Sequence, residues 1–282
     1  MIRRLSSYSP LVILPLATIV LTLSGCYNVP VTGRNSVSLV DDKDINAKAA
    51  AEFEQVKKMH KLSRNPAQIK IVNHIGSRLS KTVFWDVPLA EWEFVVFQAP
   101  TTLNAFAMPG GKVAVFSGLI DFCENEDQLA SVIAHEIAHV AARHTHERFS
   151  QGMLLSPLGA ATSIGVGGAI SGVGVYMPSV GSAVGGVTTA ATQLAFDRGK
   201  ELEADHIGLM YMAKAGYDPR EAMKLLEKME EREASSGAVG PPGWMANHPG
   251  FPQRQIQLME LMPEAIKIYE NGETGATHTI IE

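Results

Sequence analysis

The sequence has few cysteines, few aromatic residues and no excess of positive charge. Its 282 residues include two cysteines, Cys26 and Cys123, and aromatic residues make up 7% of the chain. If Cys26 carries a lipid, as its context predicts, Cys123 has no partner for an intramolecular disulfide, and we expect it to be a small buried residue. The net charge of −5, without a basic cluster that contains aromatics, argues against nucleic acid as a partner.

Charge is missing altogether from one long stretch. Residues 149–196 contain no charged side chain and no histidine, and they are rich in glycine. The section 158–177 is long enough for a transmembrane helix, but Pro157 and Pro178 bracket it, and glycine at this density disfavours a helix. We interpret 149–196 as a flap over the active cleft or a membrane-contacting segment, with a transmembrane helix as the alternative.

The N-terminus has the features of an export signal. Two arginines precede an apolar run, 11–23, that is too short for a stable membrane span. The run ends in Leu-Ser-Gly-Cys, which resembles a bacterial lipobox, with cleavage before Cys26 and lipid attached to its thiol. We therefore expect residues 1–25 to be a signal peptide and 26–40 a lipidated N-terminal extension. An ordinary signal peptide or an N-terminal membrane anchor is the alternative.

Acylation of Cys26 predicts a location for the mature protein. The lipid would hold it on a bilayer, facing the bacterial periplasm. Tyr27 follows the cysteine, whereas the signal for inner-membrane retention usually has aspartate there. The outer membrane is therefore favoured over the inner one.

An HExxH motif lies in an apolar segment that is predicted to be helical. His135 and His139 are four residues apart, so both imidazoles lie on one helix face at a separation that a zinc ion can bridge. Glu136 is placed to take a proton from a metal-bound water. The alternative is a surface helix with two solvated histidines, but its nearly all-apolar flanks predict a buried helix.

A third ligand is needed to complete a hydrolytic zinc site. Glu201 and Asp205 are four apart on a later predicted helix, hence on one face. Glu201 is the candidate ligand, and Asp205 is placed to accept the distal N–H of a ligating imidazole. Glu203 is expected to point elsewhere into solvent. Together with HExxH, this pattern is typical of a glutamate-type zincin with one zinc ion per chain.

Hydrophobic periodicity and turn residues predict the remaining elements. The predicted helices span 41–62, 67–81, 125–148, 198–214, 219–233 and 252–261, and the predicted strands 92–97 and 113–116. The segment 104–111, with its Pro-Gly-Gly turn, is either an ordinary hairpin or an edge strand that takes the substrate as an added strand. We therefore expect a mostly helical α+β, zincin-type metalloprotease domain over 41–282, with a small β-sheet whose edge strand borders the active site.

Several motifs of the chain resemble one known family. They are Pro30 to Arg34, Asn104 to Gly111, Glu126 to Val140, Arg143-His144, Glu201 to Asp205, and Asn247-His248-Pro249 with Arg254. The chain resembles the HtpX-like and type I CAAX-prenyl-endopeptidase family of zinc metallopeptidases. It is most similar to the periplasmic lipoprotein branch, which itself resembles the mitochondrial inner-membrane quality-control protease.

The resemblance implies roles for individual residues. His135, His139 and Glu201 would bind zinc, Glu136 would be the general base, and Asp205 would support the site. The family's edge strand corresponds to Asn104, Ala105, Phe106 and Ala107, which would bind the substrate.

Two downstream residues are further catalytic candidates. His248 and Arg254 fall in the segment that matches the family, so either is a candidate second donor to the oxyanion. His248 could instead block the open zinc position at rest, or be a packing histidine. His144 and His146 are expected to be helix-end cations.

The sequence thus predicts a zinc endopeptidase that hydrolyses unfolded or misfolded envelope proteins as a membrane-anchored quality-control protease. The alternative is a lipoprotein chaperone or scaffold for outer-membrane assembly with little proteolysis. Polypeptide substrates, the lipid bilayer and outer-membrane assembly proteins are the predicted partners.

Overall fold

The computed structural model describes residues 26–155, 198–235, 244–250 and 252–272. The predicted signal peptide, 1–25, and most of the charge-free stretch, from residue 156 on, lie outside these residues. Within them, none of the helices combines the length and the hydropathy that crossing a bilayer requires.

A three-stranded sheet stands at the centre of the fold. Its strands are β3 (Glu93–Phe97), β4 (Ala105–Met108) and β5 (Lys112–Phe116), in the order β3-β5-β4. β5 pairs in parallel with β3 and antiparallel with β4. Gly110 and Gly111 turn the chain from β4 into β5 with φ values of +78° and +84°, which glycine adopts without steric cost. The predicted edge strand is therefore β4.

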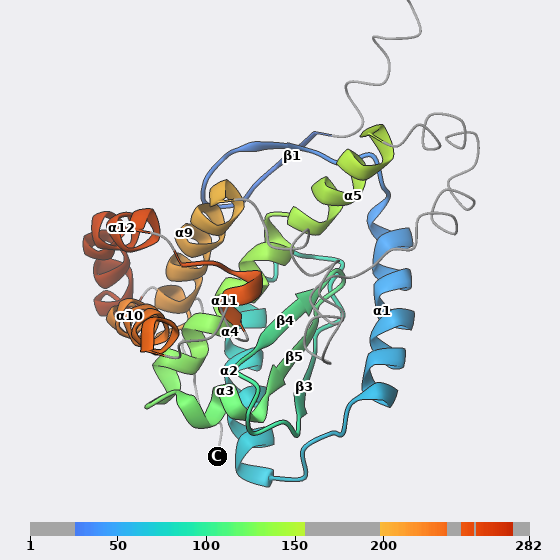
Figure 1. Ribbon diagram of the computed structural model, residues 1–282. Helices are drawn as coiled ribbons and strands as arrows, with labels where there is room; N and C mark the ends of the chain where they lie inside the picture. Colours follow the sequence, from blue (N-terminus) through green and yellow to red (C-terminus); the bar gives the residue numbers. More distant parts are fainter. Residues whose placement is uncertain (1–25, 156–197, 236–243, 251, 273–282) are drawn as a thin grey trace, which may run out of the picture.

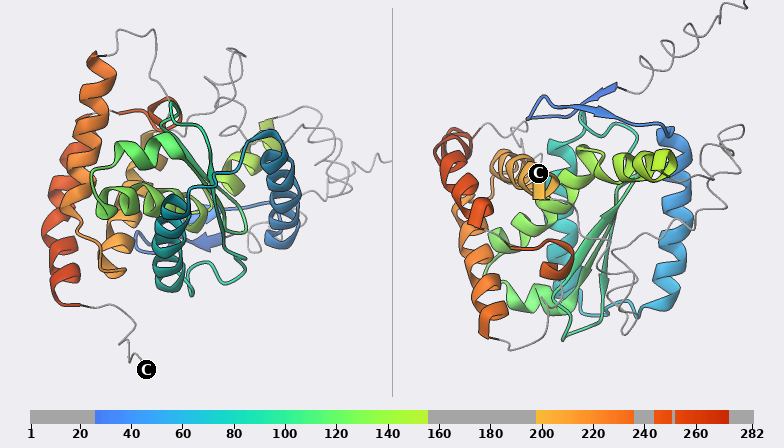
Figure 2. Two further views of the ribbon diagram at one scale, coloured as in Figure 1. Left: turned by 90° about the horizontal axis from the view of Figure 1, so that it is seen from below. Right: turned by 45° about the horizontal axis from the view of Figure 1, so that its top comes forward.

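Helices cover both faces of this sheet (Figures 1 and 2). On one face lies α1 (Asp42–Met59), whose Phe53 packs among side chains of β4 and β5. On the other lie α2 (Pro66–Thr82) and α4 (Glu126–Ala141), which share a larger core with the sheet. α1 and α2 begin where predicted, because Asp41 and Asn65 cap their first turns with side-chain oxygens.

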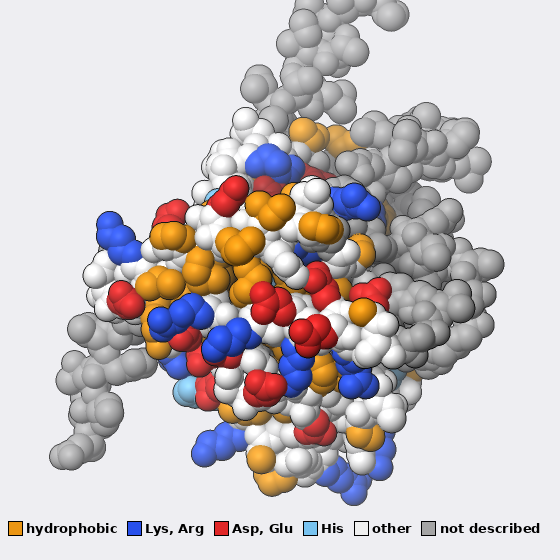
Figure 3. All heavy atoms as spheres, turned by 60° about the vertical axis from the view of Figure 1, so that its left-hand side comes forward, with side chains coloured by type: hydrophobic (Ala, Val, Ile, Leu, Met, Phe, Trp, Pro, Cys, Tyr) orange, Lys and Arg blue, Asp and Glu red, His pale blue; other side chains and the backbone are white. Residues whose placement is uncertain are grey.

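The remaining helices extend the α4 side of the molecule. They are α3 (Ser117–Phe122), α9 (Arg198–Lys214), α10 (Arg220–Ser235), α11 (Trp244–Asn247) and α12 (Pro252–Glu270). α9 packs along α4, with α10 and α12 outside it (Figure 1). α12 continues through Pro263 and ends at Glu270, nine residues beyond the predicted end at 261. Figure 3 shows this side of the molecule, where hydrophobic side chains lie among charged ones; on α12, Ile256 and Met259 are exposed.

The predicted helix 125–148 is two helices. α4 ends at Ala141, and α5 (His144–Leu155) follows after Arg143, which has a left-handed φ of +57°. Tertiary contacts stabilise this break, because the Arg143 guanidinium lies 3.8 Å above the Tyr27 ring and pairs with Asp42. The expectation of one continuous helix was wrong, since contacts from distant residues outweigh local helix propensity.

The segment 26–40 packs against the domain. β1 (Cys26–Asn28) and β2 (Asn35–Val37) form an antiparallel hairpin at the top of Figure 1. Val29 is fully buried in the main core, and the Tyr27 hydroxyl donates to the carbonyl of Ala141 at 2.9 Å. We call residues 26–37 the N-terminal hairpin; it lies against the end of the helix that carries HExxH.

Candidate metal centre

α4 holds the HExxH residues in a buried position. Asn125 caps the helix by accepting from the backbone N–H of Gln128 at 2.9 Å. Because α4 lies between the sheet and α9, it is apolar nearly all round, as its sequence indicates. His135 and His139 are 4% and 3% exposed, and their Nε2 atoms lie 3.0 Å apart. The two imidazoles therefore converge on one point.

α9 brings a carboxylate to the same point. Glu201 is completely buried, and its oxygens lie 3.4 Å from His135 Nε2 and 3.5 Å from His139 Nε2. The predicted third ligand is therefore placed beside the two histidines.

His248 completes the cluster. It follows α11, is 2% exposed, and its Nδ1 lies 3.2 Å from His135 Nε2 and 3.2 Å from both oxygens of Glu201. One ligand atom from each of His135, His139, Glu201 and His248 lies within 4.8 Å of the other three. Three imidazoles and a carboxylate suit a borderline metal such as zinc better than calcium or magnesium, which prefer oxygen ligands.

Glu136, the predicted general base, faces the cluster from the His248 side. Its Oε1 lies 3.2 Å from His248 Nε2, and the residue is 3% exposed. His248 thus contacts the predicted base with one ring nitrogen and the predicted ligands with the other.

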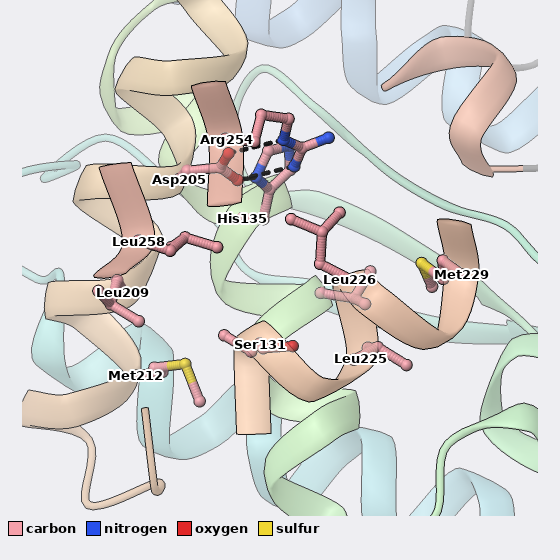
Figure 4. Close-up of a pocket in the computed structure, with 13 residues that line it drawn as sticks. Ser131, His135, Asp205, Leu209, Met212, Leu225, Leu226, Met229, Arg254 and Leu258 are labelled. Carbon is pink, nitrogen blue, oxygen red and sulfur yellow. Dashed lines mark hydrogen bonds and ion pairs between the residues drawn. The ribbon is translucent and has the colours of Figure 1, made fainter. Parts of the chain in front are cut away.

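Asp205 and Arg254 support His135 from behind (Figure 4). Asp205 Oδ1 lies 3.0 Å from His135 Nδ1, and Arg254 donates to the same carboxylate through Nε at 2.6 Å and Nη2 at 2.7 Å. Asp205 therefore accepts the proton on Nδ1 of His135, and Nε2 is the nitrogen that faces the cluster and would bind a metal. Arg254, at 1% exposure, also donates to the carbonyl of His248 at 3.1 Å. It therefore positions both Asp205 and the His248 loop.

An apolar pocket borders this support. It lies between α4, α9, α10 and α12, and Leu225, Leu226 and Leu258 contribute to its wall (Figure 4).

Two groups of the cluster, His139 and Glu201, are held in the charge state that binds a cation. His135 differs, because burial opposes its protonation but Asp205 and Glu201 outweigh burial and raise its pKa to about 9. Burial lowers the pKa of the His139 imidazole well below its usual value. Burial opposes ionisation of Glu201, but the neighbouring imidazoles, His248 foremost, outweigh it and hold the pKa of Glu201 well below its usual value. A neutral imidazole and an ionised carboxylate are the forms that bind a metal.

His144 and Glu203, which were not predicted as site residues, lie next to the cluster. His144 is fully buried, with its Nδ1 2.8 Å from His139 Nδ1, and its Nε2 lies 2.9 Å from Glu203 Oε2. His146 is 5% exposed, and both histidines lie at the start of α5. The expectations of helix-end cations and of a solvated Glu203 are therefore wrong. The left-handed turn at Arg143, which single-helix periodicity does not reveal, directs His144 back to His139.

β4 lies along α4 at the edge of the sheet (Figure 1). Asn104 is buried, and its side chain accepts from the N–H of Ala105 at 2.9 Å. Phe106 is 1% exposed and packs in the core beside α1. Ala105 and Ala107 are the other two predicted substrate-binding residues, and both lie within β4.

Comparison with known proteins identifies the family. A model of Peptidase family M48 matches residues 66–261, which include all four residues of the cluster. The chain belongs to peptidase family M48. The resemblance seen in the sequence motifs is thereby confirmed, and so is the metallopeptidase fold with its small sheet.

The chain matches a part of each of several longer M48 relatives. Mitochondrial metalloendopeptidase OMA1 of Saccharomyces cerevisiae is 32% identical over 224 residues, 76% of this chain and 61% of that protein. Metalloendopeptidase OMA1, mitochondrial, of Bos taurus is 30% identical over 253 residues, 86% of this chain and 47% of that protein. Beta-barrel assembly-enhancing protease of Yersinia pestis is 37% identical over 150 residues, 52% of this chain and 30% of that protein. The chain thus spans between 30% and 61% of the length of these three relatives.

Proposed function

We propose that this M48 chain is a zinc-dependent endopeptidase that hydrolyses peptide bonds of unfolded or misfolded proteins. The observation that carries the proposal is the convergence of His135, His139 and Glu201, with Glu136 one residue from the first ligand. These three residues would hold one zinc ion per chain, and the relatives named as metalloendopeptidases support the activity.

Bound zinc would lower the pKa of the attacking water and polarise the scissile carbonyl. The protein's own residues then supply the proton transfers. Glu136 accepts the proton of the attacking water on its carboxylate and delivers it to the leaving amine. Burial of Glu136 among the cluster keeps bulk water from competing for that proton.

His248 and Arg254 take different parts in this proposal. Arg254 donates to Asp205 and to the carbonyl of His248, so its contacts support a positioning role rather than a donor role toward the oxyanion. His248 faces both Glu136 and the ligands, which supports a resting contact that occupies the open metal position. It must move for a substrate carbonyl to enter.

The substrate would add to the sheet at β4. The N–H of Phe116 donates to the carbonyl of Asn104, and the register pairs Phe106 with Ala114. In an antiparallel ladder, hydrogen-bonded pairs alternate with pairs whose main-chain groups point outward. The N–H and C=O of Ala105 and Ala107 therefore point away from β5, toward the edge where an extended peptide would bind. Main-chain recognition fits unfolded chains of many sequences.

We further propose quality control at the bacterial envelope as the setting. A lipid on Cys26 would anchor the chain in the periplasm, with the outer membrane favoured over the inner one. The relative from Yersinia pestis is named for β-barrel assembly, which supports outer-membrane assembly proteins as partners. No observation favours the chaperone alternative over proteolysis.

The proposed activity is tested with an unfolded protein substrate. We expect the wild-type chain to cleave reduced, unfolded casein, and Glu136→Gln to bind zinc as the wild type does while losing cleavage by at least ~10³-fold, because its proton acceptor is gone. Equal cleavage by the two proteins, or zinc-loaded wild type without any cleavage, would contradict the proposal. Radioactive palmitate incorporation at Cys26, with Cys26→Ser as control, tests the anchor.

A further inference from the structure

The two histidines of HExxH have different partners behind them. His135 turns its Nδ1 to Asp205, whose carboxylate Arg254 holds. His139 turns its Nδ1 to a second imidazole, that of His144, at 2.8 Å. A short contact between two buried ring nitrogens requires that one carry a proton and the other a lone pair.

The geometry determines which nitrogen carries the proton. Binding a metal through Nε2 of His139 puts its proton on Nδ1, which donates to Nδ1 of His144. His144 then carries its own proton on Nε2, and this N–H donates to Glu203 Oε2 at 2.9 Å. All three groups are satisfied in one arrangement, with the lone pair of His139 Nε2 directed at the cluster.

Glu203 is held from the N-terminal hairpin. Nε of Arg34 donates to the Glu203 carboxylate at 2.8 Å, its Nη2 lies 2.7 Å from Oε2, and the Thr32 hydroxyl donates to Oε1 at 2.8 Å. Arg34 also donates through Nη1 to Glu147 of α5 at 2.6 Å. Arg34 of the hairpin therefore links α5 to α9 by pairing with one carboxylate on each helix.

From this chain of contacts we propose that His144, Glu203 and Arg34 form a positioning relay that fixes the orientation and tautomer of His139. We propose further that docking of the N-terminal hairpin thereby sets the affinity of the metal centre. The inference rests on the proposed zinc site and names residues that neither touch substrate nor bind the metal. It gives one function to two motifs, Pro30 to Arg34 and Arg143-His144, that the catalytic machinery does not use.

The relay parallels the support of His135. In both cases an arginine holds a carboxylate, and the carboxylate sets the proton of an imidazole. On the His139 side one more imidazole is inserted, which reaches past the end of α4 to the hairpin. Because the hairpin begins at Cys26, the segment next to the proposed lipid is connected by hydrogen bonds to the metal centre.

The first test removes the acceptor for His139. Zinc affinity of the full chain is measured by competition with a chromogenic chelator, and absorption of the cobalt-substituted protein reports the ligand geometry. We expect His144→Leu to weaken zinc binding by about 10–100-fold, as loss of a partner behind a ligand does, and to alter the cobalt spectrum. His144→Asn places an amide oxygen near the lost Nδ1, and should recover most of the affinity. Thermal unfolding of the metal-free proteins shows whether each variant is folded.

The second test addresses the hairpin and leaves the buried core unchanged. Arg34 is 39% exposed in its side chain, and we expect Arg34→Gln to weaken zinc binding about 3–10-fold, in keeping with loss of a charge-assisted hydrogen bond beyond the first partner. The same substitution in the His144→Leu background should have little further effect, because the connection is already broken. Arg220→Gln, which removes an exposed pair with Asp218, is the matched control and should leave zinc affinity unchanged.

The outcomes separate the relay from the zinc site itself. A wild-type chain that does not bind zinc would overturn the proposed function. A zinc-binding wild type with unchanged affinity in folded His144→Leu, or in Arg34→Gln if His144→Leu does not fold, would overturn the relay. Equal effects of Arg34→Gln in both backgrounds would show that the hairpin does not act through His144.

Discussion

Gly208 of α9 lies against the backbone of His135 on α4. A Cβ atom at Gly208 would stand 3.1 Å from both the amide nitrogen and the Cα of His135. The absence of a side chain therefore lets the two helices approach closely, and the same approach brings Glu201 and Asp205 of α9 to the two nitrogens of His135. The packing of these two helices therefore sets the placement of the candidate ligands.

Gly208→Ala tests this coupling. The new methyl group meets backbone atoms, which cannot rotate away, so α9 must shift by a few tenths of an ångström. We expect a loss of stability of about 1–3 kcal/mol, typical of overpacking, outweighing the helix propensity that alanine adds. Thermal unfolding and zinc affinity should both fall. A more stable variant with unchanged zinc affinity would show that the helices are not in limiting contact.

His248→Ala tests what the loop after α11 does at rest. The imidazole lies within 3.2 Å of Glu136 Oε1 and of His135 Nε2, in the space that a substrate carbonyl would take in the proposed mechanism. We expect its removal to raise basal cleavage of an unfolded protein about 3–10-fold, because a contact of ~1 kcal/mol no longer has to be broken. Zinc content is measured in parallel. A fall in kcat by ~10² or more at full zinc content would instead assign His248 as an oxyanion donor.

Ala107→Pro tests β4 as the substrate edge. The register directs the N–H of Ala107 away from β5, so proline removes an outward donor and spares the ladder bonds at Phe106 and Met108. We expect kcat/KM to fall about 2–10-fold with zinc affinity unchanged, as for one lost hydrogen bond. Ala107→Ser keeps the N–H and is the control. Equal losses in both variants would point to the side chain, and no loss in either to another binding edge.

Much of this protein could be read from local patterns. The helices predicted from 41, 67 and 125 begin within one residue of those positions, where Asp41, Asn65 and Asn125 cap the first turns, because a side-chain oxygen satisfies the first N–H groups of a helix in any context. The Pro-Gly-Gly turn is equally local, since its two glycines adopt positive φ. Helix geometry places His135 and His139 on one face of a helix, and the need of a zinc site for a third ligand pointed to Glu201 on a later helix.

Other features could not be read this way. Apolar periodicity predicted a helix that continues through Arg143. In the structure Arg143 has a left-handed backbone, which its side-chain contacts with Tyr27 and Asp42, more than a hundred residues away, stabilise. The sequence around Glu203 is typical of a solvated helix face, whereas in the structure His144 and Arg34 both contact its carboxylate. Such contacts join residues that no local pattern connects.

The sequence by itself indicated the chemistry: two imidazoles at helical spacing beside a carboxylate that can accept a proton, and a further carboxylate on a later predicted helix. The tertiary structure decided what surrounds and orients that chemistry. It brought His248 against Glu136, placed Arg254 behind Asp205, and linked His139 through His144 to the N-terminal hairpin. The physical reason is range: spacing along one helix fixes which side chains share a face, whereas the partner of each ring nitrogen depends on how separate elements pack.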